Sequence, residues 1–329
     1  LASVDKSITI LTLNSDESGS VMDYAKNQDI KFEAIERSPE DLAAILYTSG
    51  TTGHPKGVQL TNKNFAAANE SVNGIVPFEE GSTNLVCMPG YHVAGTNWGI
   101  WGYIFGCRNI IIADIDPGLI LELIESERIR SSLFVPAVIL FLISHPNAQT
   151  TDFSSLNFVL YGASPIADDT IIRAQEIMKC DLYQVYGLTE TYGHVVECLW
   201  NNKWDNLPDE EQSSIKARQG VAMPMMESTT VVDTDCKQIQ MDGVTQGEIV
   251  MRGNSVMKGY YKNPEATEKA FKNGYFHSED IAVQHSDGMM QIADRMKDII
   301  ISGGENISSI EVESAIMAHP AVSLCAVVA

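Results

Sequence analysis

The sequence is poor in positive charge. Its 329 residues contain 22 Lys and Arg against 43 Asp and Glu, which gives a formal net charge of −21 at pH 7. This balance argues against nucleic acid and anionic membrane surfaces as partners, because both would repel an acidic protein. Local cationic groups must therefore meet any polyanionic ligand.

Cysteine patterns and long apolar runs are also missing. The six cysteines include no C-x-x-C pair, and no His/Cys cluster has the spacing of zinc ligands. The most apolar run, 133–143, is short and interrupted by Pro136, so it does not predict a membrane-spanning helix. We therefore expect reduced thiols, a cytoplasmic location and no stable membrane insertion.

The chain has neither an initiator Met nor a signal peptide, and it ends at Ala329 within an apolar run. We expect a fragment of a longer protein, truncated at both ends. Its length predicts two or three structural units, and 44% apolar residues are enough for substantial cores.

The most informative stretch is Tyr47–Gly57, which reads YTSGTTGHPKG and follows the apolar run 42–46. Its glycines permit backbone conformations that turn successive N–H groups toward an anion. Hydroxyl groups add donors, and Lys56 supplies a mobile point charge. The stretch predicts a phosphate-binding loop, with a solvated Gly/Thr turn as the alternative. It is not a Walker loop, because Gly57 and not Ser or Thr follows Lys56.

Hydrophobic patterning predicts an α/β region after this loop. We expect Thr61 to cap a helix, in the strand, loop, helix order of α/β proteins. Short buried strands are predicted at 84–88, 109–113, 132–135, 157–161 and 181–186, with helices at 119–128 and 166–178. Such alternation predicts a mostly parallel sheet, whose ligands bind beyond the carboxyl ends of the strands.

Beyond Trp200 the pattern changes to a period of two. Short strands at 229–232, 247–252, 275–276, 281–284 and 289–292 predict a small β-barrel. A charged hinge, a strand and a Gly-Gly turn follow near residue 295, and Ser308 with Glu311 predicts a capping box for a further helix. The predicted division is 1–40, the end of a preceding α/β portion; 41–200, the main α/β portion; 201–294, the β-barrel subdomain; and 295–329, the start of a small α+β lid domain.

Eight spaced motifs, in this order, resemble the adenylate-forming superfamily and, within it, the AMP-forming acyl-CoA synthetases. They are YTSGTTGHPKG (47–57), MPGYHVAG (88–95), YGAS (161–164), YGLTE (186–190), GEIVMRG (247–253), MKGYYKNPEAT (257–267), YFHSEDIA (275–282) and DRMKDIIISGGENISSIEVE (294–313). The last is most similar to enzymes acting on short- or medium-chain fatty acids or related small carboxylates. The resemblance implies that 41–200 binds nucleotide and acyl group. The implied reaction joins a carboxylate to ATP, releases pyrophosphate, and transfers the acyl group to coenzyme A.

The resemblance also implies the nucleotide contacts. Around the departing pyrophosphate it places Thr48, Ser49, Gly50, Thr51, Thr52, Gly53 and Lys56. It implies a Mg²⁺ ion held by Glu190 and Thr51 beside Thr189. The implied adenine and ribose contacts are Gly162, Ala163, Ser164, Tyr186, Gly187, Asp280, Ile292 and Arg295. An ionised Asp280 would accept from both ribose hydroxyls. A solvent-facing Glu190 and a core Tyr186 are the alternatives.

For the acyl side, the resemblance implies that His92 gates carboxylate entry and acts with Lys56, Thr189 and Glu190 in catalysis. The acyl-pocket candidates are Trp98, Gly99, Tyr161, Gly187 and His194. Lys297 matches the hinge on which the lid rotates, and Gly303, Gly304 and Glu305 resemble the segment lining the coenzyme A tunnel. A lone His is more often structural, and a structural turn would also explain the glycines.

Two departures leave other functions open. The family usually has Gly before the ribose Asp, whereas this chain has Glu279, which adds bulk and negative charge there. The family's C-terminal catalytic lysine lies beyond Ala329, so we expect this fragment to bind ATP or acyl-adenylate but to adenylate poorly. The alternatives are an acyl-AMP ligase, a carrier-protein adenylation domain, or a regulatory protein that binds nucleotide without chemistry. The GGENIS segment favours coenzyme A over a carrier, and the resemblance leaves a homodimer open.

Overall fold

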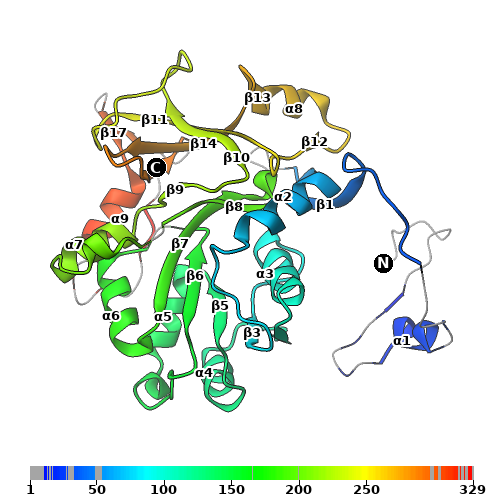
Figure 1. Ribbon diagram of the computed structural model, residues 1–329. Helices are drawn as coiled ribbons and strands as arrows, with labels where there is room; N and C mark the ends of the chain where they lie inside the picture. The colour runs from blue at the N-terminus through cyan, green and yellow to red at the C-terminus, as the bar shows by residue number, and fades with distance from the viewer. Residues whose placement is uncertain are drawn as a thin grey trace. The chain divides into compact units, whose positions relative to one another are not determined.

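Figure 1 shows the computed structural model of the chain. The structure describes residues 11–12, 14, 16, 18–26, 28, 33–48, 54–164, 166–198, 200–296, 300–302, 305–317, 319, 322 and 325–327. Leu1–Ser38 and Pro39–Ala329 are separate compact units. The first contains helix α1 (Ser20–Ala25), and the second contains the site described below.

The parallel sheet at the centre of the second unit has the strand order β4-β3-β5-β6-β7-β8-β9 (Figure 1). Its strands are β3 (Thr83–Val86), β4 (Arg108–Ile111), β5 (Ser131–Phe134), β6 (Phe158–Gly162), β7 (Asp181–Leu188), β8 (Gly193–Glu197) and β9 (Val221–Ala222). The pairs from β4 to β7 are parallel, and those of β8 and β9 are antiparallel. The predicted parallel sheet is confirmed, and β9 extends it past residue 200.

Helices cover both faces of this sheet. They are α2 (Asn62–Val72), α3 (Val93–Ile104), α4 (Pro117–Ser126), α5 (Pro136–Ser144), α6 (Asp168–Met178) and α7 (Asp209–Lys216), with 3₁₀ turns η1 (Pro146–Gln149), η2 (Thr189–Thr191) and η3 (Asn202–Trp204). The chain moves from β3 toward the edge strand β4 and then back across to β5, β6 and β7. Right-handed crossovers therefore place α3 on one face and α4, α5 and α6 on the other. The chain thus changes direction between β3 and β5, and sheets of this kind bind ligands beyond the carboxyl ends of the strands at such a point.

Burial of both faces explains the composition of the central strands. Every residue of β5 and β6 is buried, as expected for strands with helices on both sides. The largest side chains of this core include Trp98 and Trp101 from α3 and Tyr161 from β6. None of the described helices has the length and apolar character needed to cross a bilayer.

An antiparallel barrel sheet forms a curled half-barrel, with the order β10-β11-β14-β13 and β15 beside β14. Its elements are β10 (Met226–Val232), β11 (Gln246–Gly253), β13 (Phe271–Lys272), β14 (Tyr275–Gln284) and β15 (Met290–Arg295), with helix α8 (Pro264–Ala270) before β13. The expected small β-barrel region is confirmed. The two strands predicted at 275–276 and 281–284 are one strand, because a bulge at 278–280 joins them opposite a single residue of β11.

The predicted phosphate loop lies within a hairpin. Strand β1 (Leu42–Thr48) pairs with β2 (Lys56–Thr61), and β12 (Gly259–Tyr260) pairs with the other edge of β2. The expected strand, loop, helix order is therefore wrong, because β2 stands between the loop and α2. Val58 and Leu60 are fully buried on either side of the more exposed Gln59, which is compatible with a short strand. Thr61 does cap α2, since its hydroxyl accepts from the Asn64 N–H.

The end of the chain follows the barrel sheet. Strands β16 (Ile300–Ser302) and β17 (Glu305–Ile307) form a hairpin before helix α9 (Ser309–Met317). The sequence predicts the first strand and the helix, but not the second strand. The Asp294 carboxylate accepts from the Ser309 N–H at 2.6 Å and holds the first turn of α9 to β15. The side chain of Glu311 lies outside the described residues, so the capping box stays a prediction.

Candidate active site

A buried carboxylate, Asp280, joins the two sheets. Its Oδ2 accepts a hydrogen bond from the Tyr186 hydroxyl at 2.6 Å, and its Oδ1 lies 3.3 Å from Arg295 Nε. Tyr186 belongs to β7 of the parallel sheet, whereas Arg295 lies opposite Asp280 in the β14–β15 ladder. Three residues that the sequence placed in a nucleotide site therefore meet at one point.

The surroundings of Asp280 shift its titration. Burial raises the pKa of Asp280, while Tyr186 and Arg295 act against that shift. Burial and the Asp280 charge raise the pKa of Tyr186 well above its usual range, so its hydroxyl stays protonated and donates. A carboxyl with a raised native pKa stabilises the fold most at low pH, and that contribution is lost as pH rises through the native pKa. The ionised form, which accepts from two hydroxyls, therefore costs stability.

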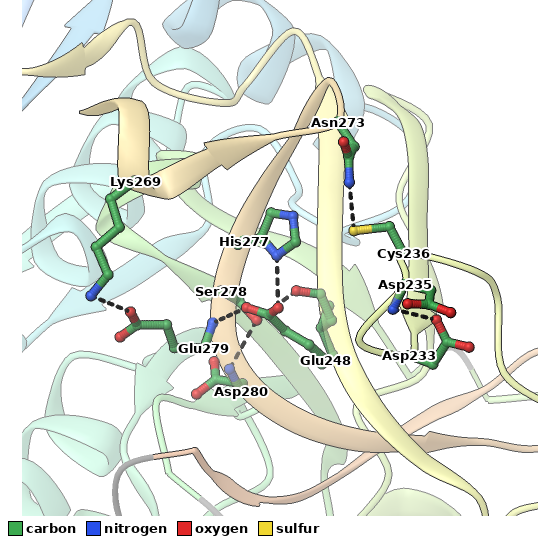
Figure 2. Close-up of polar contacts among 11 residues, drawn as sticks. Asp233, Asp235, Cys236, Glu248, Lys269, Asn273, His277, Ser278, Glu279 and Asp280 are labelled. Atoms are coloured by element: carbon green, nitrogen blue, oxygen red, sulfur yellow. Dashed lines mark hydrogen bonds and ion pairs between the residues drawn. The ribbon is translucent and has the colours of Figure 1, made fainter. Parts of the chain in front are cut away.

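The bulge at 278–280 positions Asp280 (Figure 2). Glu248 of the neighbouring strand β11 stabilises the bulge through two contacts. Its Oε1 accepts from the Glu279 N–H at 3.0 Å, and its Oε2 lies 2.7 Å from His277 Nδ1. The Ser278 hydroxyl accepts from the Asp280 N–H at 3.1 Å. Bulges re-aim side chains beside active sites, and this one directs Asp280 toward Tyr186. Sequence reasoning quoted Glu248 within GEIVMRG but gave it no role.

Glu279 has a left-handed backbone with φ of +61°. Glycine adopts this conformation freely, which is a physical reason for Gly at this position in the family. The Glu279 side chain is half exposed, and its Oε1 lies 3.7 Å from Lys269 Nζ (Figure 2). The charge that the sequence placed beside the ribose site is therefore paired with a lysine of α8.

A second cluster surrounds Glu190. Lys56 Nζ lies 5.0 Å above the ring of Tyr260, and the Tyr260 hydroxyl donates to Glu190 Oε1 at 2.8 Å. Burial, followed by the Glu190 charge, raises the pKa of Tyr260 above its usual range, so this hydroxyl is a donor. The Met257 N–H donates to the Glu190 carbonyl at 2.7 Å. Tyr260 thus links two predicted catalytic residues, although the sequence analysis quoted it only within MKGYYKNPEAT.

Glu190 suits a magnesium ion that arrives with its nucleotide. Mg²⁺ takes one or two carboxylates and completes its shell with waters and phosphate oxygens. Within the described part of the chain, no group of three or more His, Cys, Asp or Glu could hold a metal. Glu190, with Thr189 beside it in η2, would therefore supply the protein side of the shell. Thr51 lies outside the described residues.

Several predicted positions lie outside the described residues, and their roles stay predictions. They are Ser49, Gly50, Thr51, Thr52, Gly53, Lys297, Gly303 and Gly304. Thr48 ends β1 directly opposite Lys56, and Glu305 begins β17 opposite Ser302. Ile292 lies in β15, where its N–H donates to Gln219 Oε1 at 2.6 Å.

The carboxyl end of β6 lies close to β7. A Cβ on Gly162 would lie 2.2 Å from the Val185 carbonyl oxygen, so only glycine fits there. Ala163 follows with φ of +71° and leads into Ser164. Gly187 is equally confined, since a Cβ would lie 1.9 Å from the Gly193 carbonyl oxygen. The backbone is therefore tightly packed at the residues where the adenine site is predicted.

Of the residues predicted for the acyl side of the site, His92 lies at the start of α3, whereas Trp98 and Tyr161 lie in the core. His92 is the N-cap of α3, where its Nδ1 accepts from the Ala94 N–H at 3.2 Å, and partial burial lowers its pKa. Its ring is therefore neutral at pH 7. Trp98 donates its indole N–H to the Leu85 carbonyl at 3.0 Å, and the Tyr161 hydroxyl donates to the Lys216 carbonyl at 2.7 Å. Their rings pack in the core, and an acyl-pocket role stays a prediction.

His194 lies on β8 opposite Gly187 and is buried. Its ring meets the ring of Trp101 edge-on, with 5.1 Å between centroids. Helix α3, which begins after His92, thus faces β8 along the acyl side of the site.

A parallel α/β sheet packed with a curled half-barrel is the fold of the adenylate-forming superfamily. The family of AMP-binding enzymes matches residues 2–261 of the chain. Acetate–CoA ligase CCL3 of Humulus lupulus is 40% identical over 89% of this chain and 52% of its own length. For 4-hydroxybutyrate–CoA ligase 2 of Metallosphaera sedula the values are 41%, 87% and 52%. ATP-bound MatB from Rhodopseudomonas palustris superposes with a TM-score of 0.85 at 30% identity, covering 97% of this chain and 61% of MatB.

The chain belongs to the AMP-binding enzyme family. It spans about half the length of the curated relatives it matches.

The geometry at Glu279 predicts that Glu279→Gly stabilises the protein. The left-handed conformation costs a non-glycine residue about 1–2 kcal/mol, and the greater entropy of glycine in the unfolded chain offsets about 0.5–1 of that. The exposed contact with Lys269 adds little. We expect the free energy of unfolding to rise by about 0.5–1 kcal/mol in urea titrations. ATP affinity should stay within about twofold, since the side chain pairs away from Asp280. A loss of stability would contradict this account.

Proposed function

We propose that this chain carries the nucleotide and carboxylate sites of an AMP-forming acyl-CoA synthetase, an acid–thiol ligase. The carboxylate oxygen attacks the α-phosphorus of ATP, and the bond to the departing pyrophosphate breaks. The thiol of coenzyme A then displaces AMP from the acyl-adenylate and forms a thioester. The observation that carries the proposal is the convergence of Tyr186, Asp280 and Arg295 on one buried point beside the Lys56–Tyr260–Glu190 cluster.

Electrostatics explains why these groups are needed. A carboxylate approaching an anionic phosphate is repelled by about 4 kcal/mol per charge pair at 4 Å and an effective dielectric of 20. Lys56 offsets part of this repulsion, and a Mg²⁺ ion at Glu190 would neutralise phosphate charge. Neutral His92, at the start of α3, adds no charge where the carboxylate enters.

The substrates follow from the same proposal. ATP, coenzyme A and a small carboxylate are the reactants, and the relatives' names, for acetate and 4-hydroxybutyrate, support a short acid. The six cysteines are free, which supports a reducing compartment such as the cytoplasm. We also propose that the protein forms a homodimer. Its proposed structural portions are separated at residues 40, 200 and 294.

A carboxylate panel tests the proposed function. A full-length protein that contains this chain is incubated with ATP, Mg²⁺, coenzyme A and acids of two to eight carbons, and AMP and thioester are measured together. We expect both products in equal amounts with a short acid. AMP without thioester would favour the acyl-AMP ligase or carrier adenylation alternatives. ATP binding without acid-dependent AMP release would favour a regulatory protein.

The Tyr186 hydroxyl gives a second prediction. Tyr186→Phe removes the donor that orients Asp280, and hydrogen bonds to charged groups contribute about 1.5–3 kcal/mol. We expect KM for ATP to rise at least about tenfold with kcat nearly unchanged. Because Tyr186 lowers the pKa of Asp280, its loss should also move the acid limb of ATP affinity to higher pH.

Tyr183→Phe is the matched control, because Tyr183 lies on the same strand and its hydroxyl contacts Asp181 away from the site. Its kinetic constants should equal those of the wild type. Equal effects of the two substitutions would contradict the role given to Tyr186.

A further inference from the structure

Strand β8 carries a buried ionisable pair that the proposed chemistry does not use. His194 and Glu197 have side chains only 4% and 3% exposed, with 3.5 Å between Nε2 and Oε2. Neither atom has a hydrogen-bond partner among the described residues. Buried polar atoms are normally hydrogen-bonded, because leaving one unpaired costs its full desolvation. The two atoms lie within ion-pair distance of each other but form no hydrogen bond, so each keeps unused hydrogen-bonding capacity inside the protein.

The pair points toward helix α3. His194 lies opposite Gly187, and Glu197 lies opposite Val185, so both side chains leave the same face of the sheet. The Trp101 ring of α3 meets the His194 ring on this face.

The same face of α3 carries a third unmatched polar atom. Asn97 lies one turn before Trp101, and its Nδ2 donates to the Tyr192 carbonyl at 2.7 Å. Its Oδ1 is buried without a hydrogen-bond partner in the described part of the chain. The α3–β8 layer therefore contains three buried polar atoms without a hydrogen-bond partner among the described residues, whereas the polar side chains beside Trp98, Asn84 and Asn109, bond to each other.

This layer leads away from the reaction site. Gly187 precedes Thr189 by two residues, so His194, opposite Gly187, lies about 7 Å along the sheet from the level of Thr189. Helix α3 begins directly after His92 at the same end. A short acid with its carboxylate between His92 and Thr189 would extend toward His194 and Glu197.

We propose that His194 and Glu197 bind the far end of the acid, and that the preferred substrate is a short carboxylic acid with a hydroxyl group there. This inference rests on the proposed function and names its substrate class. A hydroxyl donates to the Glu197 carboxylate and accepts from an imidazole N–H, so one group satisfies both atoms. A methyl group satisfies neither. A second carboxylate at the far end of the acid would be repelled by the negative charge of Glu197. An ammonium group there could not accept a hydrogen bond from His194.

Matched acids test the inference. Straight-chain acids of four, five and six carbons, each with and without a terminal hydroxyl, are compared by AMP release with ATP, Mg²⁺ and coenzyme A. We expect kcat/KM at least about tenfold higher for one hydroxy acid than for its unsubstituted partner, because a site built for a hydroxyl rejects the analogue without it. Equal or better use of the unsubstituted acids would overturn the inference while the proposed function stands. No AMP with any acid would overturn both.

A double variant assigns the preference to the pair. In His194→Leu/Glu197→Val both polar partners are removed together, which limits the loss of stability. We expect the hydroxy-acid preference to fall to within about threefold, through KM for the hydroxy acid. Ser155→Ala, a buried polar residue bonded to Ile124 on the α4 side, is the control and should keep the preference.

A preference that survives in the folded double variant would overturn the inference. If thermal unfolding shows that the double variant does not fold, Glu197→Gln takes its place. This substitution keeps the shape but removes the charge, and the preference must fall with it as well.

Discussion

The contact between Asp280 and Tyr186 ties the barrel sheet to the parallel sheet, and the arrangement of the site depends on it. Asp280 is buried, so its charge is costly unless donors meet it. Tyr186 and Arg295 supply those donors from two different strands. The carboxylate therefore fixes the separation of the sheets and is also held ready for two further hydroxyl donors. A ribose offers that pair of donors.

The bulge of β14 makes this placement possible. A regular strand pairs its residues one to one, whereas three residues at 278–280 stand opposite one residue of β11, and Asp280 directly follows the left-handed Glu279. Glu248 holds the bulge through the Glu279 N–H and His277, and Glu279 accepts a left-handed backbone as a result. The strained backbone at Glu279 thus accompanies the placement of its neighbour Asp280 against Tyr186.

Local patterns predicted most of the fold, since strands buried on both faces and amphipathic helices have periods that short windows reveal. The hairpin at 42–61 was mistaken for a strand, loop, helix unit, because β2 is short and directly precedes the Thr61 cap. The bulge in β14 was predicted as a break between two strands, because the partner strand β11 that shows its continuity lies far away in the sequence. Among candidate site residues, those in spaced motifs, including Asp280 and Arg295, could be proposed from the sequence. Tyr260, Glu248 and Glu197 were not given roles, because their importance comes from contacts across strands that no local pattern contains.

The central claim is that Asp280, Lys56 and Glu190 serve one reaction, adenylation of a carboxylate. Exchange of labelled pyrophosphate into ATP in the absence of coenzyme A measures that step alone, because only a reversible attack of the acid on ATP incorporates the label. For a full-length protein that contains this chain, the account predicts exchange that requires both Mg²⁺ and a short carboxylic acid and that falls sharply in Asp280→Asn. Exchange without any acid, or ATP binding with no exchange under any acid, would contradict it.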